Sequence, residues 1–480
     1  MTIIDKLLLL EEQSKSLEPN FEERNELNTF SKEYSDKFYK NIKTNKSYNS
    51  FLENKSRKNN LEINDSPVNV DQIAEIFSNE IEKPGLNPAS GGHLGYIPGG
   101  GIFASATADY LAAVTNKYSG VYFGSPGAVK TENALIRWLG NIVGYDNVFW
   151  GNLTSGGSIA NLTAIVTARK TKKINSTNIR KSVIYCSKQV HHCITKGIKI
   201  AGLEECILRF VELDSKFRID SEKLKTQIDQ DKKDGLNPFL LIGSAGTTDV
   251  GAIDPINELA DISEENNLWF HVDAAYGGFF ILVDSEKDKF KGIERADSIV
   301  LDPHKGLFIP YGLGTVLVKN KQHLHDAHTY TANYMQDALE PDSEPSPAHY
   351  SAELTKHFRG LRLWLPLKLY GIKPFKAALE EKLVLTHYFY EEVQKIEGME
   401  VGDFPDLSVM TYRYIPKNGD ANEFNKKLLK LIHEDGRVFI SSTIIKGNFT
   451  LRLACLSVRT HKDTIDLLLE VLREKIGVMN

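Results

Sequence analysis

The chain has 480 residues, of which 41% are hydrophobic and 25% are charged, and its formal net charge is −5. This mild acidity argues against a nucleic-acid-binding protein, which usually carries a basic face. Four cysteines are too few for a disulfide framework, and no stretch approaches the roughly 20 apolar residues of a membrane span. We therefore expect a cytoplasmic protein with neither a membrane nor a nucleic-acid partner.

Residues 1–89 are predicted to form an N-terminal arm. The segment 4–18, IDKLLLLEEQSKSLE, contains helix formers but no long periodic face. Lys and Asn are concentrated in residues 39–63, which favours a solvated helix or loop. Two interpretations stay open for the arm, namely packing on a partner subunit and a loosely ordered tail.

Residues 90–344 alternate short apolar runs with helical patterns, as in an α/β domain with a mainly parallel sheet. One predicted helix lies in AIDPINELADISEENN (252–267), where Asp254 is a candidate N-cap and Pro255 suits the first helical position. Ligands of such sheets bind beyond the carboxyl ends of the strands. The predicted strands are 182–187, 239–246, 268–276, 297–302 and 315–320.

Residues 345–480 predict a smaller α+β domain. Two amphipathic helices are expected within 357–396, with a break near Gly371 and Pro374. Strand patterns and a last helix follow them.

The sharpest chemical signal is a lysine at a strand end. In DSIVLDPHKGLF (297–308) a strand ends at Leu301, and Lys305 lies between apolar runs. A desolvated lysine loses its charge more easily and becomes a nucleophile. The plainer alternative is a surface lysine in a loop.

A strand-end carboxylate is the second signal. Asp273 ends an apolar strand in LWFHVDAAYGGF (268–279), where a lone carboxylate is costly unless a cation or donor meets it. A protonated pyridine nitrogen would be such a partner. A helix cap or a salt bridge is the alternative.

A glycine turn before a helix is the third signal. In GNLTSGGSIANLTAIVTARK (151–170) the residues Thr154–Ser158 precede an apolar helix face. Backbone N–H groups at such a turn can hold a phosphate. A simple loop with a serine cap is the alternative.

Two histidines follow a strand in VIYCSKQVHHCITKGIKIAGL (183–203), and a flat imidazole could stack on a planar cofactor. Ordinary helix-start histidines are the alternative. A zinc site made with Cys186 and Cys193 is disfavoured, because the spacing fits no usual tetrahedral site, and no metal is predicted. GSPGAVKT (124–131) is not a P-loop, because Val129 stands where glycine must precede the lysine.

Together these signals form the set that pyridoxal phosphate requires, namely a Schiff-base lysine, a carboxylate for the pyridine nitrogen and an anion site. From about residue 67 onward, the sequence resembles the pyridoxal-phosphate-dependent group II amino-acid decarboxylases, the family of aromatic-L-amino-acid, histidine and glutamate decarboxylases. The motifs that carry the resemblance are TSGGSIANL (154–162), SKQVHH (187–192), SAGTTDVGAIDPI (244–256), HVDAAYGG (271–278) and DPHK (302–305).

The resemblance implies a role for each matching residue. Lys305 would hold the cofactor as a Schiff base, Asp273 would pair with the pyridine nitrogen, and His191, rather than His192, would stack on the ring. Tyr334 would return a proton to the substrate, where a phenylalanine would indicate an aldehyde synthase. The remaining implied contacts are Gly157 and Ser158 to the phosphate, Thr247, Thr248 and His304 to the cofactor, and Tyr96 and Ile97 to the substrate.

The resemblance also implies pyridoxal-phosphate fold type I, with a seven-stranded, mainly parallel sheet in the large domain, a smaller α+β C-terminal domain and an N-terminal helical arm. It implies a homodimer with active sites at the interface. The predicted reaction is decarboxylation of an L-amino acid to the amine and CO₂, by way of an external aldimine and a quinonoid.

We predict an aromatic substrate, because the pocket segment SGGHLGYIPGGG (90–101) has no added basic residue suited to a side-chain carboxylate. The alternatives are a decarboxylase of glutamate, sulfinoalanine, diaminobutyrate or another small amino acid, an aldehyde synthase, an aminotransferase, and a non-catalytic scaffold.

Overall fold

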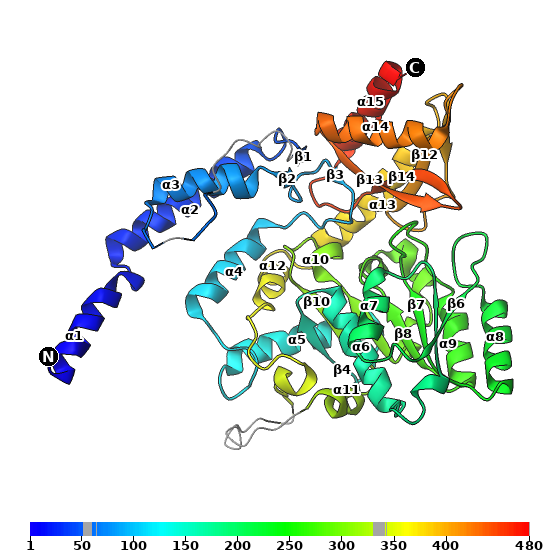
Figure 1. Ribbon diagram of the computed structural model, residues 1–480, viewed down its shortest axis with the longest axis horizontal. Helices are drawn as coiled ribbons and strands as arrows, with labels where there is room; N and C mark the ends of the chain where they lie inside the picture. The colour runs from blue at the N-terminus through cyan, green and yellow to red at the C-terminus, as the bar shows by residue number, and fades with distance from the viewer. Residues whose placement is uncertain (51–59, 64, 330–340, 342, 480) are drawn as a thin grey trace.

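A seven-stranded sheet forms the centre of the protein in the computed structural model, which describes residues 1–50, 60–63, 65–329, 341 and 343–479 (Figure 1). The antiparallel strand β10 pairs with β4 and β9, and the other pairings in the sheet are parallel. The mainly parallel α/β prediction is therefore confirmed. The strands, in sheet order, are β4 (Trp150–Thr154), β10 (Gly314–Val318), β9 (Ser298–Leu301), β8 (Trp269–Asp273), β7 (Asn237–Ser244), β5 (Ser182–Ser187) and β6 (Ile207–Val211).

Burial explains the apolar runs that predicted these strands. Every residue of β4, β5, β8, β9 and β10 is buried, as expected for a parallel sheet that is covered by helices. Helix α6 packs against β9 and β10, and α9 packs against β7 and β8. The helices of this region are α4 (Phe103–Thr115), α5 (Pro126–Ile142), α6 (Gly157–Thr171), α7 (His192–Ile200), α8 (Ser221–Lys233), α9 (Ile256–Glu265), α10 (Pro303–Gly306) and α11 (Lys321–His328).

The expected cap of α9 is wrong. The helix begins at Ile256, and Pro255 occupies the N-cap position, with no side-chain capping bond. The Asp254 carboxylate instead accepts the backbone N–H groups of Ile219 and Ser244, each at 2.7 Å. Burial raises the pKa of Asp254 to about 6. This carboxyl joins the end of β7 to the segment that precedes α8 and does not cap a helix.

A second sheet of five strands lies in the C-terminal part of the chain. The expected helix break is present, because Gly371 adopts φ +66° between two helices, a conformation that suits glycine. Strand β3 comes from the segment just after residue 90 and pairs in parallel with β13. The elements are β11 (Met399–Val401), β12 (Val409–Tyr414), β14 (Asn448–Ala454), β13 (Phe439–Ile445), β3 (His93–Leu94), α12 (Leu361–Tyr370), α13 (Lys373–Val393), α14 (Ala421–Asp435) and α15 (Lys462–Met479).

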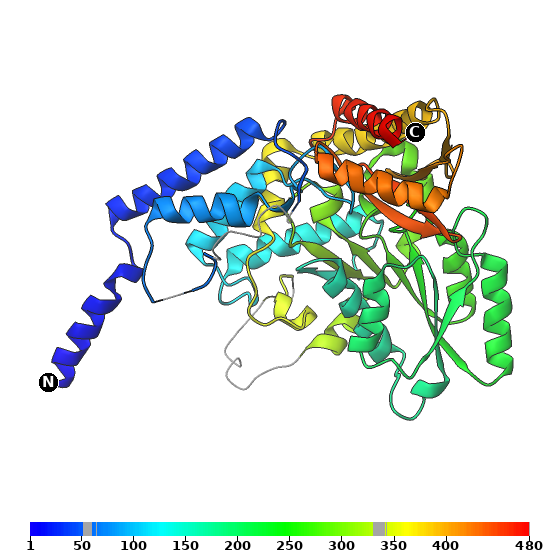
Figure 2. The ribbon, with the colours of Figure 1, turned by 45° about the horizontal axis from the view of Figure 1, so that its top comes forward.

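The N-terminal helices extend away from this body (Figures 1 and 2). Helices α1 (Ile3–Ser14), α2 (Phe21–Asn41) and α3 (Val70–Ile76) contain no buried residue. Helix α3 lies along α2, where the Tyr34 and Phe77 rings meet with their centroids 5.1 Å apart. The short strands β1 (Tyr48–Asn49) and β2 (Gly85–Leu86) pair at the base of the arm. The apolar side chains of α1 are exposed, whereas several of those in α2 are partly covered by other described residues.

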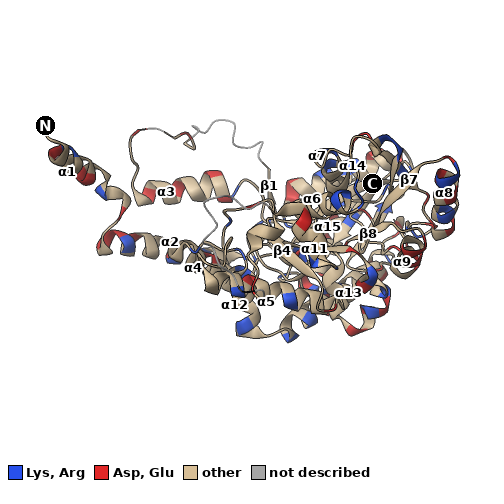
Figure 3. Cartoon of the chain, turned by 90° about the horizontal axis from the view of Figure 1, so that it is seen from below, with Lys and Arg blue, Asp and Glu red and all other residues tan. Residues whose placement is uncertain are grey.

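The surface carries charges of both signs. Figure 3 shows basic and acidic residues interspersed over the ribbon in one view of the molecule. Across the described residues, none of the helices combines the length and the apolar character that a membrane crossing requires.

Candidate active site

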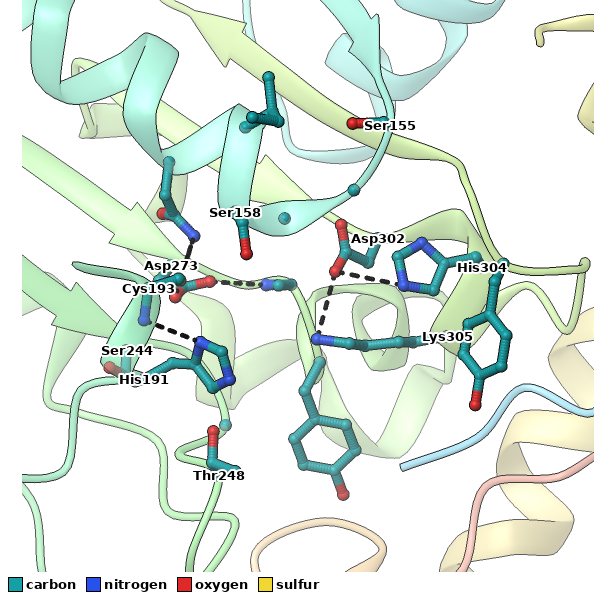
Figure 4. Close-up of a pocket in the computed structure, with 18 of the residues that line it drawn as sticks. Ser155, Ser158, His191, Cys193, Ser244, Thr248, Asp273, Asp302, His304 and Lys305 are labelled. Carbon is teal, nitrogen blue, oxygen red and sulfur yellow. Dashed lines mark hydrogen bonds and ion pairs between the residues drawn. The ribbon is translucent and has the colours of Figure 1, made fainter. Parts of the chain in front are cut away.

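A cavity of about 390 Å³ opens beside the carboxyl ends of β7, β8 and β9 (Figure 4). Segments that are far apart in the sequence meet there, because parallel strands end at the same edge of a sheet. The structure thus brings most of the predicted site residues around one space. Those that line the cavity are Gly157, Ser158, His191, Thr247, Thr248, Asp273, His304 and Lys305.

Lys305 projects into the cavity from the short helix α10, which follows β9. Its Nζ lies 3.2 Å from Oδ2 of Asp302, and 23% of its side chain is exposed. Burial by itself lowers the pKa of Lys305, but the charges of Asp302 and Asp273 outweigh that effect and raise it. The expectation that desolvation frees this amine of its proton is therefore wrong, because two carboxylates share the site.

Asp273 ends β8 and is 8% exposed. Its Oδ1 accepts the backbone N–H of Ala275 at 3.1 Å, and its Oδ2 accepts Nδ2 of Asn161 at 3.3 Å. Neutral donors thus hold the carboxylate in place. An incoming cationic N–H can add to these bonds, because a carboxylate offers about four lone-pair sites.

The glycine turn begins helix α6 and lines the same cavity, where Figure 4 labels Ser155 and Ser158. Gly156 occupies the N-cap position, and no side chain caps the helix. The backbone N–H of Ile159 donates to the carbonyl of Gly156, whereas those of Gly157 and Ser158 remain for an anion. A Cβ at Gly157 would lie only 2.7 Å from Oδ2 of Asp302, so close packing also requires glycine there.

His191 precedes α7 and faces the cavity (Figure 4). Its Nδ1 accepts the backbone N–H of Cys193 at 3.2 Å, so the ring proton of the neutral imidazole lies on Nε2. Burial, and next the neighbouring His192, lower the pKa of His191 to about 4. Burial raises the pKa of the Cys193 thiol to about 12. His191 therefore presents a neutral, flat ring.

Two further predicted residues have fixed orientations. His304 donates from Nδ1 to the carbonyl of Leu313 at 2.6 Å, and its Nε2 lies 3.7 Å from Oδ2 of Asp302. The Thr247 hydroxyl accepts the backbone N–H of Ala252 at 3.1 Å and so closes its own loop.

The predicted substrate residues lie elsewhere. Tyr96 and Ile97 are not among the residues that line this cavity. Both adopt positive φ, at 53° and 57°, which is uncommon for residues other than glycine. The Tyr96 side chain is 63% exposed, whereas that of Ile97 is buried in the large core. Tyr334, the predicted proton donor, lies outside the described residues.

Sequence reasoning missed two residues at the centre of the site. Asp302 lies in the motif DPHK, directly after the strand predicted to end at Leu301, and the sequence gives it no role of its own. Its second oxygen, Oδ1, is buried without a hydrogen-bond partner among the described residues. Asn161 lies four residues after Gly157, one helical turn further into α6. This spacing places both residues on one face of the helix, so it could have indicated that Asn161 also faces the site.

The residues around the cavity fit pyridoxal phosphate. They supply a lysine amine, a buried carboxylate held by neutral donors, and an uncapped helix N-terminus with glycines where an anion must approach. These are the groups that this cofactor needs from a protein.

Comparisons with known proteins agree with this fit. The pyridoxal-dependent decarboxylase conserved domain matches residues 53–415. An aromatic-L-amino-acid decarboxylase from Bacillus atrophaeus is 34% identical over 393 residues, which cover 80% of this chain and 82% of that protein. A phenylacetaldehyde synthase from Petunia hybrida is 28% identical over 438 residues, or 86% of this chain and 87% of that protein.

The fold has close counterparts among solved structures. The tryptophan decarboxylase of Catharanthus roseus, solved in complex with L-tryptophan, superposes with a TM-score of 0.88 at 24% identity and covers 96% of this chain and 100% of its own. Fold and site thus define the class of fold-type-I pyridoxal-phosphate enzymes. The chain belongs to the pyridoxal-dependent decarboxylase family, and it is a pyridoxal-phosphate-dependent amino-acid decarboxylase.

Proposed function

We propose that the protein converts an aromatic L-amino acid into the corresponding amine and CO₂. The observation that carries this proposal is the convergence of Lys305, Asp273 and His191 on one cavity. The relatives support the choice of substrate, since those from Bacillus atrophaeus and Catharanthus roseus are named aromatic-L-amino-acid decarboxylases.

Each of these side chains has a part in the proposal. Lys305 holds the cofactor covalently, Asp273 keeps a proton on the pyridine nitrogen, and His191 covers one face of the ring. Bound pyridoxal phosphate supplies an electron sink for the electrons left when CO₂ departs. Because the site residues are fixed by packing and hydrogen bonds, they orient substrate and cofactor without reorganising.

The remaining predicted residues complete the site. Gly157 and Ser158 bind the phosphate through backbone N–H groups, and Thr247, Thr248 and His304 contact the cofactor. Tyr334 returns the proton to the α-carbon after CO₂ leaves. The residues proposed to contact the substrate side chain are Tyr96 and Ile97.

We also propose a cytoplasmic homodimer whose active sites lie at the subunit interface, without a membrane or nucleic-acid partner. The arm has exposed apolar side chains, such as Leu7 and Leu8, which are 60% and 61% exposed. They support the homodimer, because a second copy of the chain would bury them. The mixed charges in Figure 3 and the net charge of −5 agree with the absence of nucleic acid. Sedimentation should give twice the chain mass.

The test is a panel of the standard L-amino acids, given to the purified protein with pyridoxal phosphate. Release of CO₂ with the amine of tryptophan, tyrosine or phenylalanine supports the proposal. Preference for glutamate, sulfinoalanine or diaminobutyrate overturns the substrate, and a keto acid product overturns the reaction. No release from any substrate, with no cofactor absorption band, would indicate a scaffold.

Aldehyde formation is the second candidate, because the Petunia hybrida relative is named a phenylacetaldehyde synthase. Tyr334 decides between the two products in our proposal, since it supplies the proton that completes the amine. The wild-type protein should form amine, and Tyr334→Phe should consume dissolved O₂ and water and form aldehyde, ammonia and hydrogen peroxide beside CO₂. Aldehyde from the wild-type protein would contradict the assignment.

A further inference from the structure

A chain of buried polar side chains lies behind Asp273. Asn161 Nδ2 is 3.3 Å from Oδ2 of Asp273, and Asn161 Oδ1 is 2.7 Å from His271 Nε2. His271 Nδ1 is 2.8 Å from Ser298 Oγ, which in turn receives Trp269 Nε1 at 2.9 Å. The side chains of this polar chain are all buried, at most 1% exposed: Asn161, His271, Ser298 and Trp269.

The two ends of the chain together fix the direction of every bond, because the indole N–H of Trp269 can only donate and the Asp273 carboxylate, which receives Asn161 Nδ2, can only accept. The indole N–H of Trp269 can only donate, so it donates to Ser298, whose own proton is then free to go to His271 Nδ1. A neutral His271 then carries its proton on Nε2 and donates it to Asn161 Oδ1. Burial, which lowers the pKa of His271 to about 4, keeps that ring neutral.

Asn161 is thereby left with one orientation. Its carbonyl oxygen is engaged by His271, so its amide N–H₂ must face Asp273 Oδ2 and Cys193 Sγ, the latter at 3.5 Å. A flipped amide would turn an oxygen toward the carboxylate and leave His271 facing a second donor. The chain therefore presents a donor to Asp273 through a fixed, uncharged side chain.

Asn161 also joins the two ends of the site. It lies on α6 one turn after Gly157, so the helix whose N-terminus forms the anion turn also carries the donor to the Asp273 carboxylate. Gly157 in turn packs closely against Asp302, whose carboxylate forms an ion pair with Lys305. The distance between the anion turn and the strand-end carboxylate is consequently set through Asn161.

We propose that Asn161 is a positioning residue that fixes Asp273, and that Trp269, Ser298 and His271 fix Asn161 in turn. The inference rests on the proposed function of Asp273 as the partner of the pyridine nitrogen. Asn161 acts on the cofactor only through Asp273: it holds the carboxylate charged and at a constant distance from the anion turn.

The test replaces Asn161 by leucine, which has nearly the same shape but no donor, and measures the rate at which the holoenzyme releases pyridoxal phosphate into a trapping solution. Loss of a buried hydrogen bond to a charged group should make release at least about tenfold faster. The pH midpoint of the holoenzyme's visible absorption band should also rise, because a pyridine ring that is less firmly protonated withdraws fewer electrons.

Thr163→Val is the matched control. Thr163 is on the same helix and is also buried, but its hydroxyl bonds Ile159 O in its own helix and does not reach the cavity. Its release rate and absorption midpoint should equal those of the wild-type protein. Equal behaviour of Asn161→Leu and Thr163→Val would overturn the proposal.

Two further variants keep the result interpretable. Asn161→Leu should add little to Asp273→Asn, since both act through one carboxylate, and full additivity would contradict the proposal. If Asn161→Leu does not fold, Ser298→Ala decides: it removes only one hydroxyl, and faster release supports the chain, whereas wild-type release overturns it. A wild-type protein without a cofactor band or CO₂ release would instead refute the proposed function itself.

Discussion

Two buried histidines, one in each sheet, show what distinguishes the site from the rest of the core. His271 in β8 and His93 in β3 are both 1% exposed, and burial lowers the pKa of each to about 4. Both ring nitrogens of His271 are hydrogen-bonded, in the chain that ends on Asp273. Neither nitrogen of His93 has a hydrogen-bond partner among the described residues, and its ring packs against Phe439, with the centroids 5.4 Å apart.

The difference teaches that burial and a perturbed pKa do not by themselves mark a functional residue. A buried polar group without a partner costs free energy, whereas a connected group can transmit an orientation. Substitutions at the cavity edge of the central sheet should therefore change chemistry, whereas substitution of His93 in the smaller sheet should change only stability.

The largest effect is expected from Lys305→Ala. The variant should lose the cofactor absorption band and at least about a thousandfold of the decarboxylation rate, because Lys305 is the only lysine among the described residues that line the cavity. Absorbance spectra and CO₂ release measure the two effects. Lys225→Ala, at an exposed position on α8, is the control and should behave as the wild-type protein.

Asp273→Asn should lower kcat by roughly a hundredfold or more, because an amide does not keep the pyridine nitrogen protonated. Asp302→Asn provides the comparison within the same cavity. It removes the counter-charge of Lys305, so it should lower the pKa of that lysine with a smaller loss of kcat. A larger loss in Asp302→Asn would reverse the roles given to the two carboxylates.

Gly157→Ala should weaken pyridoxal phosphate binding by about tenfold, because the new Cβ must displace Asp302 and narrows the anion turn. Equilibrium titration of the apoprotein measures the change. Gly127→Ala in α5 is the matched control, since a Cβ there meets nothing within 4 Å. If both variants bind like the wild-type protein, the turn does not hold the phosphate.

The smallest effect concerns His93→Phe and appears only in acid. Because the pKa of His93 is about 4 in the fold against an ordinary 6.5, the unfolded chain takes up a proton between these values that the folded chain does not. Stability therefore falls as the pH drops from about 6.5 to about 4. Between pH 8 and pH 5, the free energy of unfolding measured with urea should fall by about 1–2 kcal/mol less in the variant than in the wild-type protein.

His93→Phe removes only part of the acid sensitivity, because His191 and His271 have similarly lowered pKa values. Its decarboxylation rate at pH 8 should equal that of the wild-type protein. An equal loss of stability in both proteins, or a lower rate, would contradict the contrast between the two sheets.

Local sequence determined most of the secondary structure and the principal site residues. Strand 182–187 coincides with β5, the predicted strands 268–276 and 297–302 contain β8 and β9, and 239–246 and 315–320 overlap β7 and β10, which begin one or two residues earlier. Their apolar composition is readable because both faces of these strands are buried. Strands β4 and β6 were not predicted: β4 is buried but contains Gly151, Asn152 and Thr154, and β6 is only partly buried and carries Arg209 in its middle. Lys305, Asp273 and the glycine turn stood out for the same local reason: each follows or precedes a buried run.

The tertiary structure decided how these residues act together. The pKa of Lys305 depends on the carboxylates of Asp302 and Asp273, which come close to its amine only where β8 and β9 end at the same edge of the sheet. The orientation of Asp273 in turn depends on its contact with Asn161 of α6. His271 and His93 both lie in strands and are both buried. Their neighbours from other strands and helices make the difference: His271 is hydrogen-bonded in the chain that ends on Asp273, whereas His93 only packs against Phe439. The sequence by itself therefore determined which elements form and which cofactor the protein takes, whereas the tertiary structure decided the charge and orientation of the groups that hold it, because both depend on contacts between distant segments.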